Sequence, residues 1–256
     1  MMSEYLEKIV ENLNKIEHEE AKKLVEAAHE VARVIKNDGL IFVFGCGHSH
    51  IPGLDAFYRA GGLANVSPML DTDLMLHNGA AKSSRMEKMS GIAPEIFRRY
   101  VPTEKDMIFI FSASGKNQVP IEMADAAKGA RVKCVGISSM AYAEMGGKLH
   151  EHVDIAMVDS PPFLCYNQGK LHEHVDIAID CKIPYGDACM DVGEAKMGGL
   201  STYAACFILN TCLINGAKLA LEQGAKPPVY LSGNIEGGRE HNVVLENLYI
   251  GRVKHL

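Results

Sequence analysis

Three short, almost entirely apolar runs constrain the fold of this chain most strongly. They are LIFVF at residues 40–44, MIFIF at 107–111 and VKCVGI at 132–137. A strand that is apolar at nearly every position is typical of a parallel sheet covered on both faces. Between the second and third runs, QVPIEMADAAKGA has the apolar spacing of a helix. This strand, helix, strand order predicts an α/β fold with a parallel sheet and right-handed crossovers.

Helical spacing also covers both ends of the chain. Residues 1–38 have apolar side chains at three- and four-residue steps, which predicts one long N-terminal helix or a broken pair. Residues 201–224 are apolar over most of their length and end in Gly224 before two prolines, as a buried helix would. We expect VYLS at 229–232 to be a short closing strand and 236–249 to be the last helix. No linker divides the chain, so we predict one domain over residues 1–256.

Composition narrows the classes of partner and compartment. The 256 residues are 47% hydrophobic, enough for one ordinary α/β domain. The net charge of −6 and the lack of long like-charged runs argue against nucleic acid or an anionic membrane as partners. The acidic start has no signal-peptide pattern, and the seven cysteines contain no C-x-x-C pair. We therefore expect a soluble, cytoplasmic protein with reduced thiols.

Two Gly- and Ser-rich segments follow the first two apolar runs, GCGHSH at 45–50 and SASGKN at 112–117. Ligands of open parallel sheets bind beyond the carboxyl ends of the strands, and helix starts favour anions. The first segment is no dinucleotide fingerprint, because His50 replaces the third glycine, so a smaller phosphate ligand fits better. The alternative is that these are only tight turns and helix caps. The predicted ligand-binding residues are Gly45, Gly47, His48, Ser49, His50, Ser112, Ser114, Gly115, Lys116 and Asn117.

In order, GCGHSH, FYRAGGLA, SASGKNQVPIEMA, IPYGDA and GGREHN resemble the SIS (sugar isomerase) domain proteins, in a bacterial branch related to phosphoheptose isomerase. The resemblance covers nearly the whole chain. It implies a three-layer αβα sandwich with a five-stranded parallel sheet, and homodimers or homotetramers with active sites at subunit interfaces. It also implies phosphosugar binding through Ser112 and Ser114, which match the family's S-x-S-G-x-N/T loop, and through the first glycine-rich loop.

An aldose–ketose isomerase needs a general base for the carbon-bound proton and a second polar group for the oxygens of the enediol. Guided by the resemblance, we predict Glu87 and His241 in these roles, with His48, His50 and Glu240 in reserve. The alternatives are that Glu87 is a solvated surface residue and that His241 only forms a local hydrogen bond. No local pair has the spacing of a dedicated metal site, so we predict neither a metal nor a cofactor. The alternative, which the resemblance implies, is a metal held by His48 or His50 together with His241.

Two classes of function follow from this site. The first is an isomerase acting on a phosphorylated sugar, or a related lyase or etherase. The second is a sugar-phosphate sensor without turnover, which would usually carry a DNA-binding module. No basic helix-turn-helix segment precedes residue 40, which favours the enzyme.

The ten residues GKLHEHVDIA occur twice, at 147–156 and 169–178. Two copies are too few for a solenoid, so we interpret them as a local tandem duplication within a single-copy fold. Only one copy can supply the sheet strand, and the other must form an added edge strand or a loop. We expect both His-Glu-His triplets to lie away from the ligand, and the repeat to contribute little to function.

Overall fold

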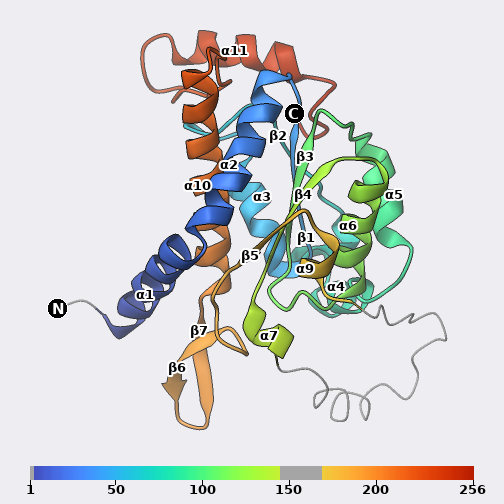
Figure 1. The fold of residues 1–256 in the computed structure, drawn as a ribbon, viewed down its shortest axis with the longest axis vertical. Helices are drawn as coiled ribbons and strands as arrows, with labels where there is room; N and C mark the ends of the chain where they lie inside the picture. The colour runs from blue at the N-terminus through green and yellow to red at the C-terminus, as the bar shows by residue number, and fades with distance from the viewer. Residues whose placement is uncertain (1–2, 145–168) are drawn as a thin grey trace.

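A five-stranded parallel sheet forms the centre of the computed structural model, which describes residues 3–144 and 169–256 (Figure 1). The strand order is β2-β1-β3-β4-β5. The strands are β1 (Ile41–Gly45), β2 (Val66–Pro68), β3 (Met107–Phe111), β4 (Lys133–Ser138) and β5 (Ile177–Asp180). In the central register, Ile41 of β1 pairs with Met107 of β3 and Met107 pairs with Lys133 of β4. The predicted fold class and five-stranded parallel sheet are confirmed.

Helices cover both faces of this sheet (Figure 1). One layer contains α1 (Glu4–Glu19), α2 (Ala21–Lys36), α3 (Ile51–Ala56) and α10 (Ser201–Glu222). The other contains α5 (Ile92–Tyr100), α6 (Gln118–Gly129) and the single turn α9 (Leu171–His174). The remaining elements are α4 (Ala80–Met86), α7 (Met140–Glu144), α11 (Gly238–Tyr249) and the hairpin of β6 (Ala188–Val192) and β7 (Ala195–Gly199).

The two helical layers explain why β1 and β3 have no polar side chain at any position. In β3, Met107, Phe109 and Phe111 belong to the apolar cluster that includes α2 and α10. The alternate residues Ile108 and Ile110 belong to the cluster that includes α5 and α6. Successive side chains of a strand point to opposite faces, so a helix layer on each face requires an unbroken apolar run.

The predicted helices at both ends of the chain are present, and the N-terminal segment is a pair broken at Glu20. The predicted strand at 229–232 was wrong. Val229 forms a single antiparallel bridge with Leu63, and no strand runs through these residues. Pro227 and Pro228 precede it and have no N–H to donate to a ladder, which leaves the segment as an irregular connection.

The second copy of the repeat occupies the sheet. Its LHEH forms α9, and β5 begins within its VDIA and pairs with β4. The first copy, at 147–156, lies outside the described residues. The sheet strand therefore comes from residues 169–178, the copy that runs on directly into IDCKIPYGDA.

Helix α10 is long and apolar enough to cross a membrane by length and composition alone. The core helix of a globular protein meets the same criterion. Here Ala204, Ile208, Leu209 and Cys212 are fully buried in the cluster shared with α2 and the sheet. We therefore interpret α10 as a core helix that also presents an exposed side.

Candidate functional site

The candidate site lies where the chain diverges from β1 and β3. The helix after β1, α3, covers one face of the sheet, and the helix after β3, α6, covers the other (Figure 1). Such a switch point opens a crevice beyond the carboxyl ends of the two strands. GCGHSH and SASGKN both lie there. A small cavity at this edge is lined by His48, Ser49, Phe111, Ser112, Ala113, Ile137, Cys181, Ser201, Thr202 and Ala205.

The first loop folds back tightly onto the end of β1. Gly47 adopts a positive φ of 57°, and the Ser49 N–H donates to the Cys46 carbonyl at 3.0 Å. A Cβ atom on Gly45 would lie 2.0 Å from the Ser49 carbonyl oxygen, so only glycine fits this close approach. His50 is buried and its ring Nδ1 contacts the Gly47 carbonyl, whereas the exposed His48 lines the cavity.

The second loop is shaped by its own hydroxyl groups. Gly115 has a φ of 63°, and its N–H donates to the Ser112 carbonyl at 3.0 Å and to Ser112 Oγ at 3.2 Å. The Lys116 N–H donates to Ser114 Oγ at 3.4 Å. Both serines therefore act as turn acceptors. Each hydroxyl keeps its own O–H as a donor, which is what a phosphate oxygen requires.

Glu87 follows α4 directly and is brought to both loops. Its carbonyl accepts from the Val119 N–H at 3.1 Å, which joins the end of α4 to the start of α6. Its side chain is hydrogen-bonded to Asn117, and its charge is one of the causes that raise the pKa of the Cys46 thiol. The structure thus places the predicted base between GCGHSH and SASGKN, with Asn117 as its partner.

Burial raises the pKa of the Glu87 carboxyl above its ordinary value, against opposing effects of Lys88 and of the Asn117 hydrogen bond. Burial disfavours the charged form of a carboxylic acid, whereas a nearby cation and a donor favour it. The shift brings the pKa closer to neutrality, where a general base works best.

His241 lies at the other end of the molecule. It sits in α11, and its Nε2 contacts the Val229 carbonyl at 2.9 Å. Val229 bridges Leu63, which precedes β2, so this region borders the amino end of the sheet (Figure 1). Glu240 is exposed on the same helix. Within one chain, the structure does not bring His241 or Glu240 to Glu87.

Several further residues lie at this edge that were not predicted from the sequence. Ser138 ends β4, and a Cβ on Gly115 would lie 3.1 Å from the Ser138 Cβ. Ser201 and Thr202, at the start of α10, line the cavity. Ligands of an open parallel sheet bind beyond the carboxyl ends of its strands, and this principle led to the first two loops. Applied to VKCVGI, it would also have led to Ser138. No local pattern would have found the start of α10.

Asp187, within IPYGDA, fixes where α10 begins. Its Oδ1 accepts from the Leu200 N–H at 2.9 Å and the Ser201 N–H at 2.8 Å, and its Oδ2 accepts from Ser201 Oγ at 2.6 Å. This carboxylate satisfies N–H groups that have no partner within the helix. It therefore positions Ser201 beside the cavity, although it lies 14 residues earlier in the chain.

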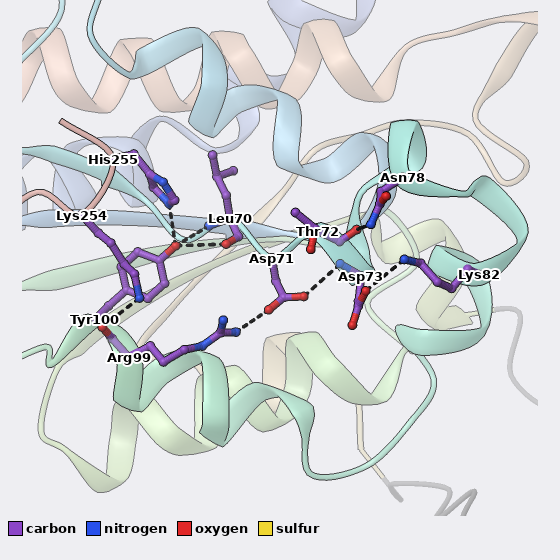
Figure 2. A network of polar contacts seen from close by, with 10 residues as sticks. All are labelled: Leu70, Asp71, Thr72, Asp73, Asn78, Lys82, Arg99, Tyr100, Lys254 and His255. Atoms are coloured by element: carbon purple, nitrogen blue, oxygen red, sulfur yellow. Dashed lines mark hydrogen bonds and ion pairs between the residues drawn. The ribbon is translucent and has the colours of Figure 1, made fainter.

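The segment between β2 and α4, which leads to Glu87, is fastened by polar contacts (Figure 2). Tyr100 OH accepts from the Leu70 N–H at 2.8 Å and lies 2.8 Å from Nε2 of His255 (Figure 2). Asp71 pairs with Arg99 of α5 in the same network. These contacts hold the segment against α5 and the C-terminal residues, and so restrict where α4 can place Glu87.

A second ion pair in this network reaches α4 itself. Lys82 Nζ lies 2.9 Å from Asp73 Oδ1 (Figure 2). Ser83 Oγ, which is buried in α4, donates to the Leu74 carbonyl at 2.8 Å. Both contacts tie α4 to the short 3₁₀ turn Thr72–Leu74 that precedes it.

In the parts of the chain that the structure describes, no three His, Cys, Asp or Glu side chains are grouped to hold a metal ion.

The fold and the loops define the chain as an αβα protein with glycine- and serine-rich turns at its β1/β3 switch point. The chain belongs to the SIS-domain family, whose model matches residues 4–139.

Its relatives include bacterial UPF0309 proteins. One from Geobacillus thermodenitrificans is 38% identical over 249 residues, covering 94% of this chain and 92% of the relative. One from Thermoanaerobacter pseudethanolicus is 39% identical over 262 residues and all of both chains. Similar solved structures include phosphoheptose isomerase from Neisseria gonorrhoeae, with a TM-score of 0.47, 14% identity and 84% and 92% coverage of the two chains. The Vibrio vulnificus NanR protein complexed with ManNAc-6P has a TM-score of 0.47, 15% identity and 96% and 67% coverage.

Proposed function

We propose that this protein binds a phosphorylated sugar at the carboxyl edge of its sheet and interconverts its aldose and ketose forms through an enediol. The observation that carries the proposal is the position of Glu87, a half-buried carboxyl hydrogen-bonded to the SASGKN loop and close to the GCGHSH loop. Membership of the SIS-domain family supports the phosphosugar part. In this proposal the protein's own side chains move the protons, without a metal or cofactor.

In this proposal the serine hydroxyls and loop N–H groups hold the phosphate, and Glu87 moves the carbon-bound proton. Ser49, Ser112 and Ser114 supply hydroxyl donors around the cavity edge. The ionised Glu87 removes the proton next to the carbonyl and returns it to the neighbouring carbon, as a positioned general base does. Asn117 keeps the Glu87 carboxylate oriented and partly stabilised in its charged form.

The second proton carrier is a histidine, and two histidines are candidates for different reasons. His48 lines the cavity in the same chain. His241 would reach a site only from a second copy, since in its own chain it contacts Val229 at the opposite end. The proposal of a homodimer or homotetramer in the cytoplasm, with sites shared between copies, favours His241.

The central test is Glu87→Gln, with Glu95→Gln on the exposed side of α5 as a matched control. A panel of pentose, hexose, heptose and amino-sugar phosphates is first screened for thermal stabilisation of the parent protein. On the substrate found, Glu87→Gln should lose turnover by a hundredfold or more while keeping ligand-induced stabilisation, and Glu95→Gln should match the parent. Unchanged turnover in Glu87→Gln would refute the base, and a parent that binds without turnover would identify a sensor.

Mixing variants separates the two histidines. If sites are shared, Glu87→Gln and His241→Ala are each inactive alone, and mixed oligomers recover part of the activity because some sites combine intact residues from both. If His48 is the carrier, His48→Ala is inactive and His241→Ala retains activity. Size-exclusion chromatography with light scattering gives the oligomeric state of each preparation.

A further inference from the structure

The turn that follows β5 holds its backbone in a strained conformation. Lys182 has a φ of 54°, in the left-handed region that a residue with a Cβ atom adopts only at a steric cost. Such strain persists where the surrounding contacts fix the backbone, and it gathers near functional sites. The preceding residue, Cys181, lines the cavity at the carboxyl edge of the sheet. The strained turn therefore forms part of the wall of the candidate site.

The junction of α1 and α2 fixes this turn through the Lys182 ammonium. Its Nζ lies 2.9 Å from Glu20 Oε1, 3.0 Å from Glu19 Oε2 and 3.2 Å from Asp180 Oδ2. The Glu20 side chain is 5% exposed and that of Lys182 18%, so most of this contact is withdrawn from water. Burial opposes the charged form of Lys182, but hydrogen bonds to the three carboxylates raise the pKa of its ammonium. The ammonium therefore stays charged and is held at the helix junction.

Backbone groups of the same turn are held as well. Asn12 of α1, which is buried, donates from its Nδ2 to the Cys181 carbonyl at 3.3 Å and to the Lys182 carbonyl at 2.9 Å. Asp180 Oδ1 accepts from the Lys182 N–H at 3.0 Å and from the Met140 N–H at 3.1 Å. The turn is thus connected both to the N-terminal helix and to the residues that follow β4.

One of the residues after β4, Ser139, connects the turn to the SASGKN loop. Its Oγ donates to the Ile183 carbonyl at 2.7 Å, and its N–H donates to the Ala113 carbonyl at 3.0 Å. Ser139 is buried, so water competes little for either hydrogen bond. The turn after β5 and the SASGKN loop are therefore joined through one buried residue.

We propose that Lys182 is a positioning residue for the phosphate site: its ion pairs hold the turn in a shape that, through Ser139, fixes the SASGKN loop for its ligand. The inference rests on the proposed phosphosugar function and extends it to the N-terminal helices. A binding loop needs such support, because a displacement of about 1 Å already spoils the geometry of a polar site. In this role Lys182 acts through the loop and does not touch the ligand.

The test compares variants of the full chain in their affinity for inorganic phosphate, by calorimetry at a temperature where every variant is fully folded. Lys182→Met keeps an unbranched apolar stem but removes the ion pairs. It should weaken binding by about threefold to thirtyfold, the range for residues that act on a site without touching its ligand. Lys182→Arg keeps the charge and should restore most of the affinity. Lys133→Met is the matched control and should match the parent, because Lys133, at the amino end of β4, forms an exposed ion pair with Asp176.

Loss of a positive charge also weakens phosphate binding through space, and Lys182→Gly separates this effect from positioning. Lys182→Met and Lys182→Gly remove the same charge, but glycine adopts a positive φ without a steric cost. Lys182→Gly should therefore keep the shape of the turn better and bind phosphate more tightly than Lys182→Met. An equal loss in the two variants would assign the effect to charge alone and overturn the inference.

Hydrogen exchange follows the same connection without ligand. The Ser139 N–H should exchange faster in Lys182→Met than in the parent, because its hydrogen bond depends on the turn. Glu19→Gln is a milder variant, since Glu19 is exposed and the other two carboxylates remain on Lys182. If Lys182→Met does not fold, faster exchange of the Ser139 N–H in Glu19→Gln supports the inference, and unchanged exchange overturns it.

The outcomes separate this inference from the proposed function. If the parent binds phosphate and Ser114→Ala weakens it, but Lys182→Met loses less than about threefold in affinity, the inference fails and the phosphate site stands. An equal loss in Lys133→Met and Lys182→Met also overturns it. A parent that binds neither phosphate nor any sugar phosphate refutes both proposals.

Discussion

Replacing Gly45 with alanine tests the geometry of the first loop directly. The added Cβ would lie 2.0 Å from the Ser49 carbonyl oxygen, 2.4 Å from the Ser49 carbonyl carbon and 2.9 Å from the Ser49 Cβ. Carbon atoms in favourable contact are separated by about 3.5–4.0 Å. The Ser49 backbone must therefore move by roughly 1 Å, and it cannot yield as a flexible side-chain tip would.

The expected size of this effect follows from the cost of overpacking, about 1–3 kcal/mol in most cases. Because the added Cβ clashes with two backbone atoms and the Cβ of Ser49, none of which is the end of a flexible side chain, we expect the upper end, about 3 kcal/mol. At about 2–4 °C per kcal/mol for a chain near this length, the melting temperature should fall by about 6–12 °C. The displaced Ser49 should also weaken phosphate binding by at least tenfold.

Scanning calorimetry measures the first effect and isothermal titration with inorganic phosphate the second. Gly129→Ala is the control, because Gly129 ends α6 and a Cβ there meets no atom within 4 Å. That variant should keep phosphate affinity and be as stable as the parent or up to about 1 kcal/mol more stable. If Gly45→Ala melts and binds phosphate as the parent does, the loop tolerates a Cβ at residue 45 and the close approach of Ser49 does not matter.

Two further predictions concern carboxylates. The raised pKa of Glu87 means that, between its unfolded and folded pKa values, the folded state holds more protons, so its contribution to stability falls as pH rises through that window. Glu87→Gln should therefore melt at a higher temperature than the parent at neutral pH, and this difference in melting temperature should shrink toward pH 4. A difference of the same size at both pH values would contradict the prediction. Asp187→Ala removes the cap of α10 and should cost about 1–2 kcal/mol in urea unfolding, with Asp187→Asn losing less. Equal unfolding midpoints for the parent and Asp187→Ala would show that the cap does not stabilise α10.

The parts of this protein that could be predicted from sequence are those encoded locally. Largely apolar runs identified β1, β3 and β4, because burial on both faces leaves few polar positions in a strand. β2 has only three residues, Val66–Pro68, which is too short for a periodic signal. The hairpin β6–β7 is largely exposed, so it also has no apolar pattern.

The candidate site also contains some residues that could be predicted from the sequence and some contacts that could not. Gly45 and Gly115 could be singled out because a turn directly after a buried strand calls for glycine. Glu87 was chosen by resemblance, but its hydrogen bond to Asn117, 30 residues later, exists only in the folded chain. The start of α10 reaches the cavity because Asp187 caps it, a contact between segments that share no local pattern.

The sequence by itself determined the buried strands and the glycine- and serine-rich loops at their carboxyl ends, since hydrophobic period and backbone freedom are properties of neighbouring residues. It could not choose between two identical copies of GKLHEHVDIA, whose local propensities are the same. Only tertiary structure decided that the second copy enters the sheet, through bonds such as Cys134 N–H to the Asp176 carboxylate at 2.9 Å and Leu171 N–H to Gly115. The same long-range packing placed residues 170 and 171 against the SASGKN loop. It also placed His241 at the end of the sheet opposite to Glu87.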